Sequence, residues 1–305
     1  MSAREARVEA QAKLNLFLRV FTREASGYHQ VETLFCRIAL SDTVSVRIDS
    51  SGRSLECHGE RYPGGGLGPV EKNLAWRAAT AYANATGFPE SFHVSIDKRI
   101  PVGGGLGGGS ADAGAVLRAL NALNPRPVPR DALLHLAATL GADVPFLAQD
   151  TATLAIGRGY GERLELLPAL PTRAVWLLIP DEAVGTADAY RWLDEAGRAN
   201  EAPVVGDRGV ASWRAVAAVA TNDFEPVVGV RVPMIGRLLS NLREPVMREL
   251  LGEDAIVLMS GSGSTIAVVA GERPDADWTP FPPVPGVDLV ETETAAFVEQ
   301  VVLTH

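Results

Sequence analysis

The chain has 305 residues, of which 47% are hydrophobic and 21% charged, a balance typical of a folded globular protein. At this length two domains are expected. The 28 basic and 37 acidic side chains give a net charge of −9, which argues against nucleic-acid or anionic-membrane binding, since both require a basic surface. A small anionic ligand stays compatible with that charge, because a few local donors can bind it.

Two cysteines, Cys36 and Cys57, are too few for a disulfide framework and form no Cys-x-x-Cys pair. We therefore expect reduced thiols, no structural zinc site and a cytoplasmic location. The first ten residues mix charges of both signs and contain no apolar core, which does not match a signal peptide. The longest weakly charged stretch, residues 255–270, is interrupted by glycines and serines, so no membrane span is expected.

The first half of the chain predicts strands followed by helices. In chain order, we expect strands over residues 15–21, 31–39 and 43–48, a Pro/Gly-rich loop over 62–69, a helix over 72–85, a strand over 91–100, a glycine-rich loop over 101–109, and helices over 110–123 and 131–140. Asp131 is the expected N-cap of the last of these helices. A glycine-punctuated hairpin region, residues 151–166, follows.

The second half begins where prolines 168 and 171 interrupt the pattern, so we place a boundary near 160–172 and expect domains of residues 1–165 and 166–305. Beyond it we expect a strand over 175–179, a helix over 187–196, a loop over 201–209, one or two helices over 235–251, and strands over 256–259 and 266–269 around a Gly/Ser loop. Strands and helices mix without regular β-α-β alternation, which favours an α+β fold over a doubly wound sheet.

The glycine-rich loop that ends at Ser110 joins a predicted strand to a predicted helix. Its glycines let the backbone adopt positive φ and approach a ligand closely. The helix that begins near Ser110 offers free N–H groups and the positive end of its dipole. Together these features predict a phosphate site. A flexible surface linker is the alternative, although a linker rarely joins a strand to a helix without a polar spacer.

We compared this loop with three known phosphate-binding motifs. It matches G-x-G-x-x-G, but a glycine run does so easily, and the helices that follow do not suit a dinucleotide fold. No Lys-Ser/Thr pair follows the glycines, which excludes a Walker A loop. The pattern Pro-x-x-x-Gly-Leu-x-x-x-Ser-x-Asx-Ala over residues 101–113 instead resembles the phosphate loop of the GHMP (galactokinase, homoserine, mevalonate, phosphomevalonate) kinase superfamily.

The other two superfamily motifs occur in the same order, Ala-Lys-Leu-Asn-Leu at 12–16 and Met-Ser-Gly-Ser-Gly-Ser at 259–264. Four further stretches resemble the 4-diphosphocytidyl-2-C-methyl-D-erythritol kinase family of the non-mevalonate isoprenoid pathway, namely residues 27–29, 32–35, 97–101 and 140–146. The resemblance implies a two-domain GHMP kinase fold with its active site in the interdomain cleft. It also implies transfer of the ATP γ-phosphate to the 2-hydroxyl of the cytidyl diphosphate substrate.

Phosphoryl transfer to an alcohol requires a held γ-phosphate, neutralised charge and a group that takes up the hydroxyl proton. Asp143 is the expected base, because the catalytic aspartate of the family falls on it; a helix or turn cap is the alternative. We expect Pro145 to block regular helix beyond it. Lys13 lies in an apolar strand, where a buried lysine needs an anionic partner. The resemblance pairs Lys13 with Asp143, and an exposed edge-strand lysine is the alternative.

The resemblance further implies the residues that bind ATP and Mg²⁺. It places Asn73 and Leu74 near the adenine and Lys98 on the nucleotide side. Ser110 is placed near the phosphates and Mg²⁺, for which a serine hydroxyl is a suitable ligand. Ala111 stands where many relatives have a second serine. The phosphate loop itself comprises Pro101, Val102, Gly103, Gly104, Gly105, Leu106, Gly107, Gly108, Gly109, Ser110 and Ala111.

The cytidine end of the substrate is expected to lie between aromatic side chains, since each stacked base contributes roughly 1–3 kcal/mol. Tyr28 and His29 match the family there, and Tyr190 is the expected second stacking face. Asn15 and Phe35 would complete the substrate wall, although Phe35 is as readily explained by core packing.

Two other functions stay open at this point. One is a sister kinase of the superfamily that acts on mevalonate, homoserine or a sugar, and the other is a non-catalytic nucleotide sensor on the same fold. Intact Lys13, Ser110 and Asp143 favour a kinase over the sensor. The sequence leaves a homodimer open.

Overall fold

The computed structural model describes residues 4–49, 52–197, 205, 209–272 and 281–304, and within these residues the strands form two sheets. The first sheet contains β1 (Arg4–Arg23), β2 (His29–Ile48), β3 (Arg53–His58), β4 (Phe92–Asp97), β5 (Leu154–Arg158), β6 (Arg163–Leu167) and β11 (Val302–Thr304). The second contains β7 (Ala174–Pro180), β8 (Ile256–Met259), β9 (Ile266–Val269) and β10 (Val287–Glu293).

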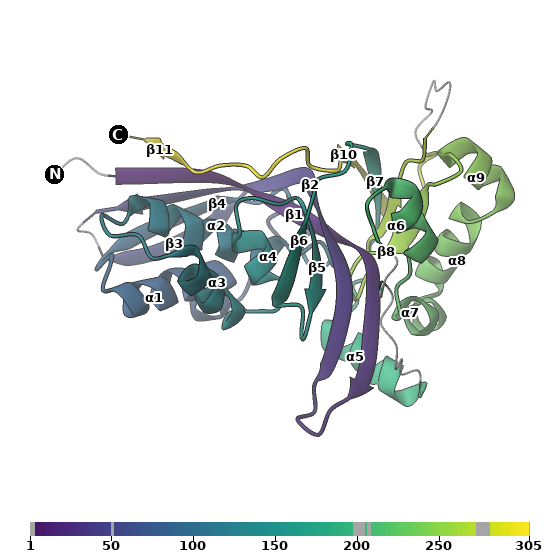
Figure 1. The fold of residues 1–305 in the computed structure, drawn as a ribbon, viewed down its shortest axis with the longest axis horizontal. Coiled ribbons are helices and arrows are strands. Elements are labelled where there is room, and N and C mark those ends of the chain that lie inside the picture. Colours follow the sequence, from purple (N-terminus) through teal and green to yellow (C-terminus); the bar gives the residue numbers. More distant parts are fainter. Residues whose placement is uncertain (1–3, 50–51, 198–204, 206–208, 273–280, 305) are drawn as a thin grey trace.

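Strands β1 and β2 form a long antiparallel hairpin that runs through the molecule (Figure 1). The first sheet has the order β11-β1-β2-β4-β3, with β5 pairing to the other end of β2 and β6 pairing to β5. All of its pairs are antiparallel except β3 with β4. Three register shifts interrupt the β1–β2 ladder, and one of them falls between Gln11 and Lys13, at the edge of the site described below.

Four helices gather against the first sheet, α1 (Leu74–Thr86), α2 (Gly108–Leu123), α3 (Arg130–Ala138) and α4 (Val144–Ala148), with a 3-10 turn at Val70–Lys72 before them (Figure 1). Helix α2 is the central one, because every residue from 111 to 120 is buried. Its alanines, glycine and valine allow sheet and neighbouring helices to approach from all sides. The glycine-rich loop that precedes it therefore starts from a rigid support.

The second half of the chain also contains α5 (Thr186–Glu195), α6 (Trp213–Val219), α7 (Glu225–Arg231), α8 (Pro233–Leu242) and α9 (Pro245–Leu251), of which α8 packs against β8 and β9. Strand β7 is buried on both faces, as its continuous apolar run requires. Leu178 packs with Ile235 in one core cluster, whereas Leu177 belongs to the cluster that fills the first sheet. The two halves therefore share buried surface.

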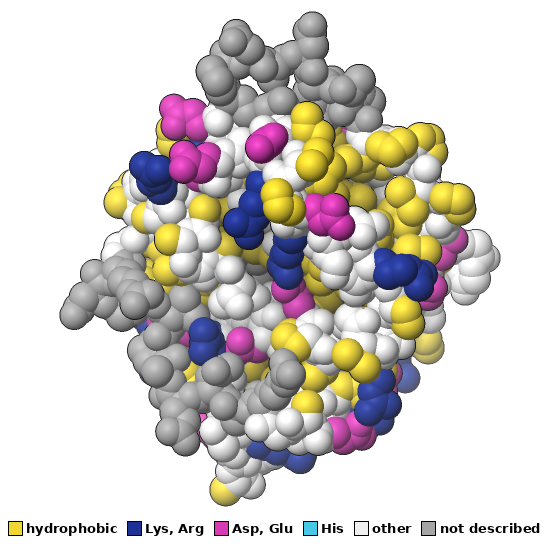
Figure 2. Space-filling model, turned by 90° about the vertical axis from the view of Figure 1, so that its right-hand side faces the viewer, with side chains coloured by type: hydrophobic (Ala, Val, Ile, Leu, Met, Phe, Trp, Pro, Cys, Tyr) yellow, Lys and Arg dark blue, Asp and Glu magenta, His cyan; other side chains and the backbone are white. Residues whose placement is uncertain are grey.

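The α6–α9 end of the molecule mixes acidic, basic and apolar side chains, and neither sign of charge covers this face (Figure 2). Among the residues that the structure describes, no helix combines the length and apolar character that a membrane span requires.

Much of the predicted element order is confirmed, including the α+β class and the strands at 256–259 and 266–269. The strands expected over 31–39 and 43–48 are one strand, β2, because nothing between them breaks the extended backbone. The helix expected from Ser110 begins two residues earlier, at Gly108. Most of the loop expected over 201–209 lies outside the described residues.

Other expectations were wrong. Pro129, and not Asp131, is the N-cap of α3. Pro145 does not stop a helix but occupies the first turn of α4, where its missing N–H has no helical partner to lose. The sheets change between β6 and β7, and β11 returns to the first sheet. We keep the division into residues 1–165 and 166–305 as a proposal, in which β11 belongs to the second range but pairs with a strand of the first.

Candidate active site

A cavity of about 690 Å³ is lined by residues of both halves of the chain. One side comes from β1, β2, the glycine-rich loop and the start of α4. The other side comes from the first turn of α5, the N-cap of α7 and residues 261–263. Segments far apart in the chain therefore meet around this cavity.

At some of its glycines the glycine-rich loop lies so close to its neighbours that a side chain would not fit. At Gly105, with φ of 79°, an added Cβ would lie 2.1 Å from the Ser260 carbonyl oxygen. At Gly107, with φ of 73°, it would lie 3.0 Å from Lys13 Cε. Gly107 is also the N-cap of α2, so the first free N–H groups of this helix open onto the cavity.

The Gly/Ser loop between β8 and β9 packs directly on the glycine-rich loop. Ser260 Oγ donates to the Gly105 carbonyl (3.1 Å), and the Thr265 N–H donates to the Gly104 carbonyl (3.3 Å). Asn222 supports this loop from behind, because its Nδ2 donates to the carbonyls of Met259 (2.6 Å) and Gly261 (2.7 Å). Motifs more than 150 residues apart in the chain thus meet.

Lys13 reaches the cavity from β1 and is only 3% exposed. Its Nζ donates to Asn15 Oδ1 (2.6 Å) and to the Gly105 carbonyl (2.9 Å), and it lies 3.4 Å from Asp143 Oδ2. Its backbone N–H donates to the Leu106 carbonyl (3.0 Å), which ties β1 to the glycine-rich loop. A buried position in the sheet excludes the exposed edge-strand lysine considered from the sequence.

Asp143 is the N-cap residue of α4, yet its side chain makes no capping hydrogen bond. The carboxylate instead faces Lys13 and lines the cavity, with its side chain 31% exposed. Burial raises the pKa of the Tyr190 hydroxyl to about 12, and the negative charge of Asp143 adds to this shift. Asp143 and Tyr190 thus approach the cavity from opposite halves of the chain.

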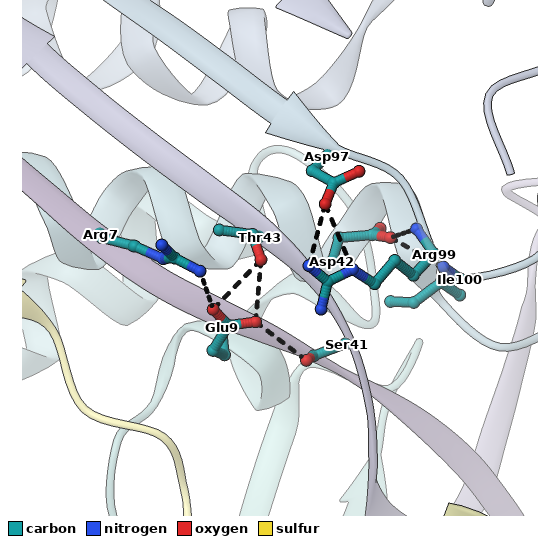
Figure 3. A network of polar contacts seen from close by, with 8 residues as sticks. All are labelled: Arg7, Glu9, Ser41, Asp42, Thr43, Asp97, Arg99 and Ile100. Carbon is teal, nitrogen blue, oxygen red and sulfur yellow. Dashed lines mark hydrogen bonds and ion pairs between the residues drawn. The ribbon is translucent and has the colours of Figure 1, made fainter. Parts of the chain in front are cut away.

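Lys98 lies beneath the start of α2, where its Nζ contacts Asp42 and Asp112 (2.7 Å to the latter). Asp42 Oδ1 also accepts the backbone N–H groups of Arg99 (2.6 Å) and Ile100 (2.8 Å), just before the glycine-rich loop (Figure 3). Burial raises the pKa of Asp112 to about 7, although Lys98 counteracts that shift. Lys98 lines the cavity, but its ammonium is already paired with these carboxylates.

The residues expected near the nucleotide line one end of the cavity. Asn73 is the N-cap of α1 and accepts the Ala75 N–H (2.9 Å), while Leu74 follows it in the first turn. Ser110 lies half-buried in the first turn of α2. The wall here is formed by Leu67, Asn73, Leu74, Lys98, Ile100, Pro101, Val102, Gly103, Gly104, Gly105, Leu106, Gly107, Gly108, Gly109 and Ser110. Ala111, 2% exposed, is buried behind the loop and is not part of this wall.

The aromatic residues expected at the cytidine end are arranged differently from the simple sandwich predicted. Tyr190 lines the cavity, but His29 stacks on it from behind, with ring centroids 5.2 Å apart. Tyr28 is 69% exposed and is absent from the cavity lining. Its ring instead meets the edge of Tyr160, at 5.9 Å, and Tyr160 does line the cavity.

Asn15 and Phe35 both line the cavity, and each is also fixed by the core. Asn15 donates to Thr33 Oγ1 (2.8 Å), and Phe35 stacks on Phe146 at 5.0 Å. The sequence did not single out other wall residues, which include Thr33, Ala142, Tyr160, Gly161, Val184, Thr186, Phe224 and Ser262. The Gly-Tyr-Gly sequence around Tyr160 could have indicated this residue, since a tyrosine between two glycines lies exposed in a turn.

Comparison with known proteins supports the kinase family whose motifs the sequence resembles. The family model of the GHMP kinases N terminal domain matches residues 73–151. The 4-diphosphocytidyl-2-C-methyl-D-erythritol kinase of Desulfitobacterium hafniense (strain Y51) is 37% identical to this chain over 262 residues, 84% of each chain. A crystal structure of 4-(cytidine 5'-diphospho)-2C-methyl-D-erythritol kinase aligns with a TM-score of 0.67 and 36% identity, over 87% of this chain and 90% of that one.

A more distant structure shares the fold. Homoserine kinase from Cytophaga hutchinsonii aligns with a TM-score of 0.63 at 16% identity, over 100% of this chain and 98% of its own. At that identity the likeness concerns the fold alone.

Proposed function

Since this chain belongs to the 4-diphosphocytidyl-2-C-methyl-D-erythritol kinase family of GHMP kinases, we propose that Asp143 is the base of its reaction and Lys13 its partner. In the proposed reaction the γ-phosphate of ATP passes to the 2-hydroxyl of the cytidyl diphosphate substrate. One observation carries the proposal: the Asp143 carboxylate lies 3.4 Å from Lys13 Nζ, which also binds the Gly105 carbonyl of the glycine-rich loop. A base has to come within hydrogen-bond reach of the hydroxyl whose proton it takes, and this contact holds the carboxylate beside the loop that would bind the phosphates.

Each part of the site then has a task. The free N–H groups at the start of α2 hold phosphate oxygens, aided by the helix dipole. The Lys13 ammonium offsets the negative charge that accumulates between the carboxylate and the transferring phosphoryl group. Asp143 accepts the proton of the attacking hydroxyl. Lys98 holds the start of the loop in place through Asp42 and Asp112.

The donor set near Ser110 fits Mg²⁺ held mainly by phosphates and water. Asp112 Oδ1 is buried without a hydrogen-bond partner, and the Ser110 hydroxyl lies in the same turn of α2. In the part of the chain that the structure describes, no cluster of three or more His, Cys, Asp or Glu side chains could enclose a metal. Ser110 would hold the ion, which on binding supplies neutralising charge to the phosphates.

The cytosine would stack in the aromatic end of the cavity, where Tyr190 and Tyr160 both form wall. Tyr28 packs against Tyr160 and would close over the base from the exposed rim. We place the reaction in the cytoplasm, which agrees with two reduced thiols, Cys36 and Cys57.

The test is the Asp143→Asn variant, assayed by coupled ADP release with 4-diphosphocytidyl-2-C-methyl-D-erythritol. We expect kcat to fall about 10²- to 10⁴-fold, because the amide cannot accept the proton. The KM for ATP should change little, since the glycine-rich loop is intact. Asp131→Asn, at an exposed position on α3, is the matched control and should keep its turnover. Near-full activity of Asp143→Asn would refute the assigned base.

Two rivals are separated by further measurements. If cytidine diphosphate slows turnover by competition and mevalonate, homoserine and galactose do not, the cytidyl substrate is supported over a sister kinase. ATP binding without ADP release in the presence of substrate would favour the nucleotide sensor.

A further inference from the structure

Asp143 is carried by a helix too short to hold its own orientation. Helix α4 has five residues, little more than one hydrogen-bonded turn, and all five are buried. Its direction must therefore come from packing. On one side α2 approaches so closely that a Cβ on Gly114 would lie 2.6 Å from the Leu147 carbonyl carbon.

On β2, Arg37 holds the other end of α4. Its side chain is 1% exposed, and its Nη2 donates to the carbonyls of Phe146 (2.7 Å) and Gln149 (2.9 Å). These carbonyls belong to the C-terminal end of α4, whose last groups have no helical partner. The guanidinium carbon also lies 5.1 Å from the centroid of the Phe146 ring, which stacks on Phe35.

Burial of an arginine at this position carries a desolvation cost. Within the described residues Arg37 has no carboxylate at ion-pair distance, although the charge of Asp150 acts on it, and its Nε is buried without a hydrogen-bond partner. Burial and the nearby charge of Arg118 lower the pKa of Arg37 to about 9 against the opposing charge of Asp150, so the guanidinium stays charged at neutral pH. The hydrogen bonds that offset the desolvation all go to the end of α4, where an apolar side chain would leave the two carbonyls without a donor.

We propose that Arg37 is a positioning residue for phosphoryl transfer. By binding the carbonyls at the C-terminal end of α4, it fixes the orientation in which Asp143, at the other end, faces Lys13. The inference rests on the proposed role of Asp143 as the base.

The size of the effect follows from the length of α4. Five residues span about 7.5 Å, so a tilt of about 15° at the C-terminal end moves the N-cap by roughly 2 Å. A misplacement of about 1 Å can reduce a rate about 10²-fold. We therefore expect Arg37→Met to lower kcat about 10- to 100-fold. The KM for ATP should change less than about threefold, because Arg37 does not line the cavity.

Arg118→Met is the matched control. Arg118 is also a buried arginine that donates to a backbone carbonyl, that of Glu299, and burial lowers its pKa too. Arg118 lies on α2 near Arg37, but its hydrogen bond goes to the segment around Glu299 and not to α4. Both variants should lower the thermal midpoint, but Arg118→Met should keep kcat within about twofold. Arg37→Lys keeps the charge and can donate to a carbonyl, so its kcat should lie between those of Arg37→Met and the unmodified protein.

Combining Arg37→Met or Arg37→Lys with Asp143→Asn separates positioning from a general loss of packing. If Arg37 acts through Asp143, the second substitution should reduce the residual rate of Asp143→Asn less than about twofold. The proposal would be overturned if the Arg37 substitution lowered kcat equally with Asp143 present and with Asp143→Asn. It would also be overturned if folded Arg37→Met or Arg37→Lys kept its kcat, or if Arg118→Met lost as much kcat as Arg37→Met. Full activity of Asp143→Asn would instead reject the assigned base.

Discussion

Two buried lysines near the glycine-rich loop differ in what surrounds them. Burial alone would lower the pKa of Lys98, but Asp112 and Asp42 outweigh burial and raise it above the ordinary lysine value. Lys98 is thus a fixed cation inside an ion-pair cluster. Lys13 has a carbonyl, an amide oxygen and the partly exposed Asp143 as neighbours. Its charge is directed at the cavity, which suits a residue that meets a transferred phosphate.

The loop glycines provide a prediction at the same scale, because Gly103 and Gly105 share a positive φ but differ in space. A Cβ on Gly103 meets nothing within 4 Å, whereas on Gly105 it lies 2.1 Å from the Ser260 carbonyl oxygen. Gly103→Ala should lower the free energy of unfolding by about 1 kcal/mol through backbone strain alone. Gly105→Ala should also push the two loops apart and raise the KM for ATP at least about tenfold. Denaturant unfolding and steady-state kinetics measure both effects, and equal behaviour of the variants would contradict the contact.

Among the elements, the crossing of α2 and α4 decides where Asp143 lies. An alanine inside a helix is normally more stable than a glycine by about 1 kcal/mol. Gly114 reverses this expectation, since its Cβ would lie 2.6 Å from the Leu147 backbone.

Gly114→Ala should therefore destabilise the protein by about 1–3 kcal/mol and lower kcat, because α4 has to move away with Asp143. Thermal unfolding and the coupled kinase assay provide the measurements. A raised midpoint with unchanged turnover would show that the crossing can relax without cost.

The predictability of the elements depended on their length. Strands β8 and β9 are continuous apolar runs around an obvious turn, and both were predicted with correct bounds. Helices α4, α6 and α7 have five to seven residues, which is too short for a periodic pattern. Pro145 was misjudged because proline marks either the end of one helix or the first turn of the next.

The site residues could be predicted only where the signal for them is local in the sequence. The three motifs that meet around Gly105 were evident in the sequence, because glycine runs and a lysine in an apolar strand are local signals. Tyr160 and Arg37 were not, since their roles depend on which distant segments pack against them. Tyr28 was predicted as a stacking wall from its motif, but its hairpin turn leaves it at the exposed rim.

For the whole molecule, the cysteines report on the integrity of the first sheet. Cys36 lies on β2 and Cys57 on β3. Burial raises their pKa values to about 12 and about 11, respectively. At pH 8 a thiol with a pKa of about 11 is only about 0.1% thiolate, against about a quarter for an unperturbed cysteine.

The folded protein should therefore react with an aromatic disulfide reagent at least about 100-fold more slowly than the protein in concentrated guanidinium chloride. Both thiols should titrate once the sheet unfolds, and mass spectrometry identifies the residue modified. Rapid labelling of Cys57 in the folded protein would show that β3 opens locally.

The last strand, β11, has a consequence for biosynthesis. It pairs through residues 302–304 with Glu5–Arg7 and covers the outer edge of β1 there. Since β1 is synthesised before β11, the backbone N–H and C=O groups of β1 at residues 5–7 have no partner on that side until residues 302–304 have been made. Such an open edge invites pairing with other nascent chains. The charged side chains of β1 near this edge, Glu5, Arg7 and Glu9, would discourage that pairing until β11 binds.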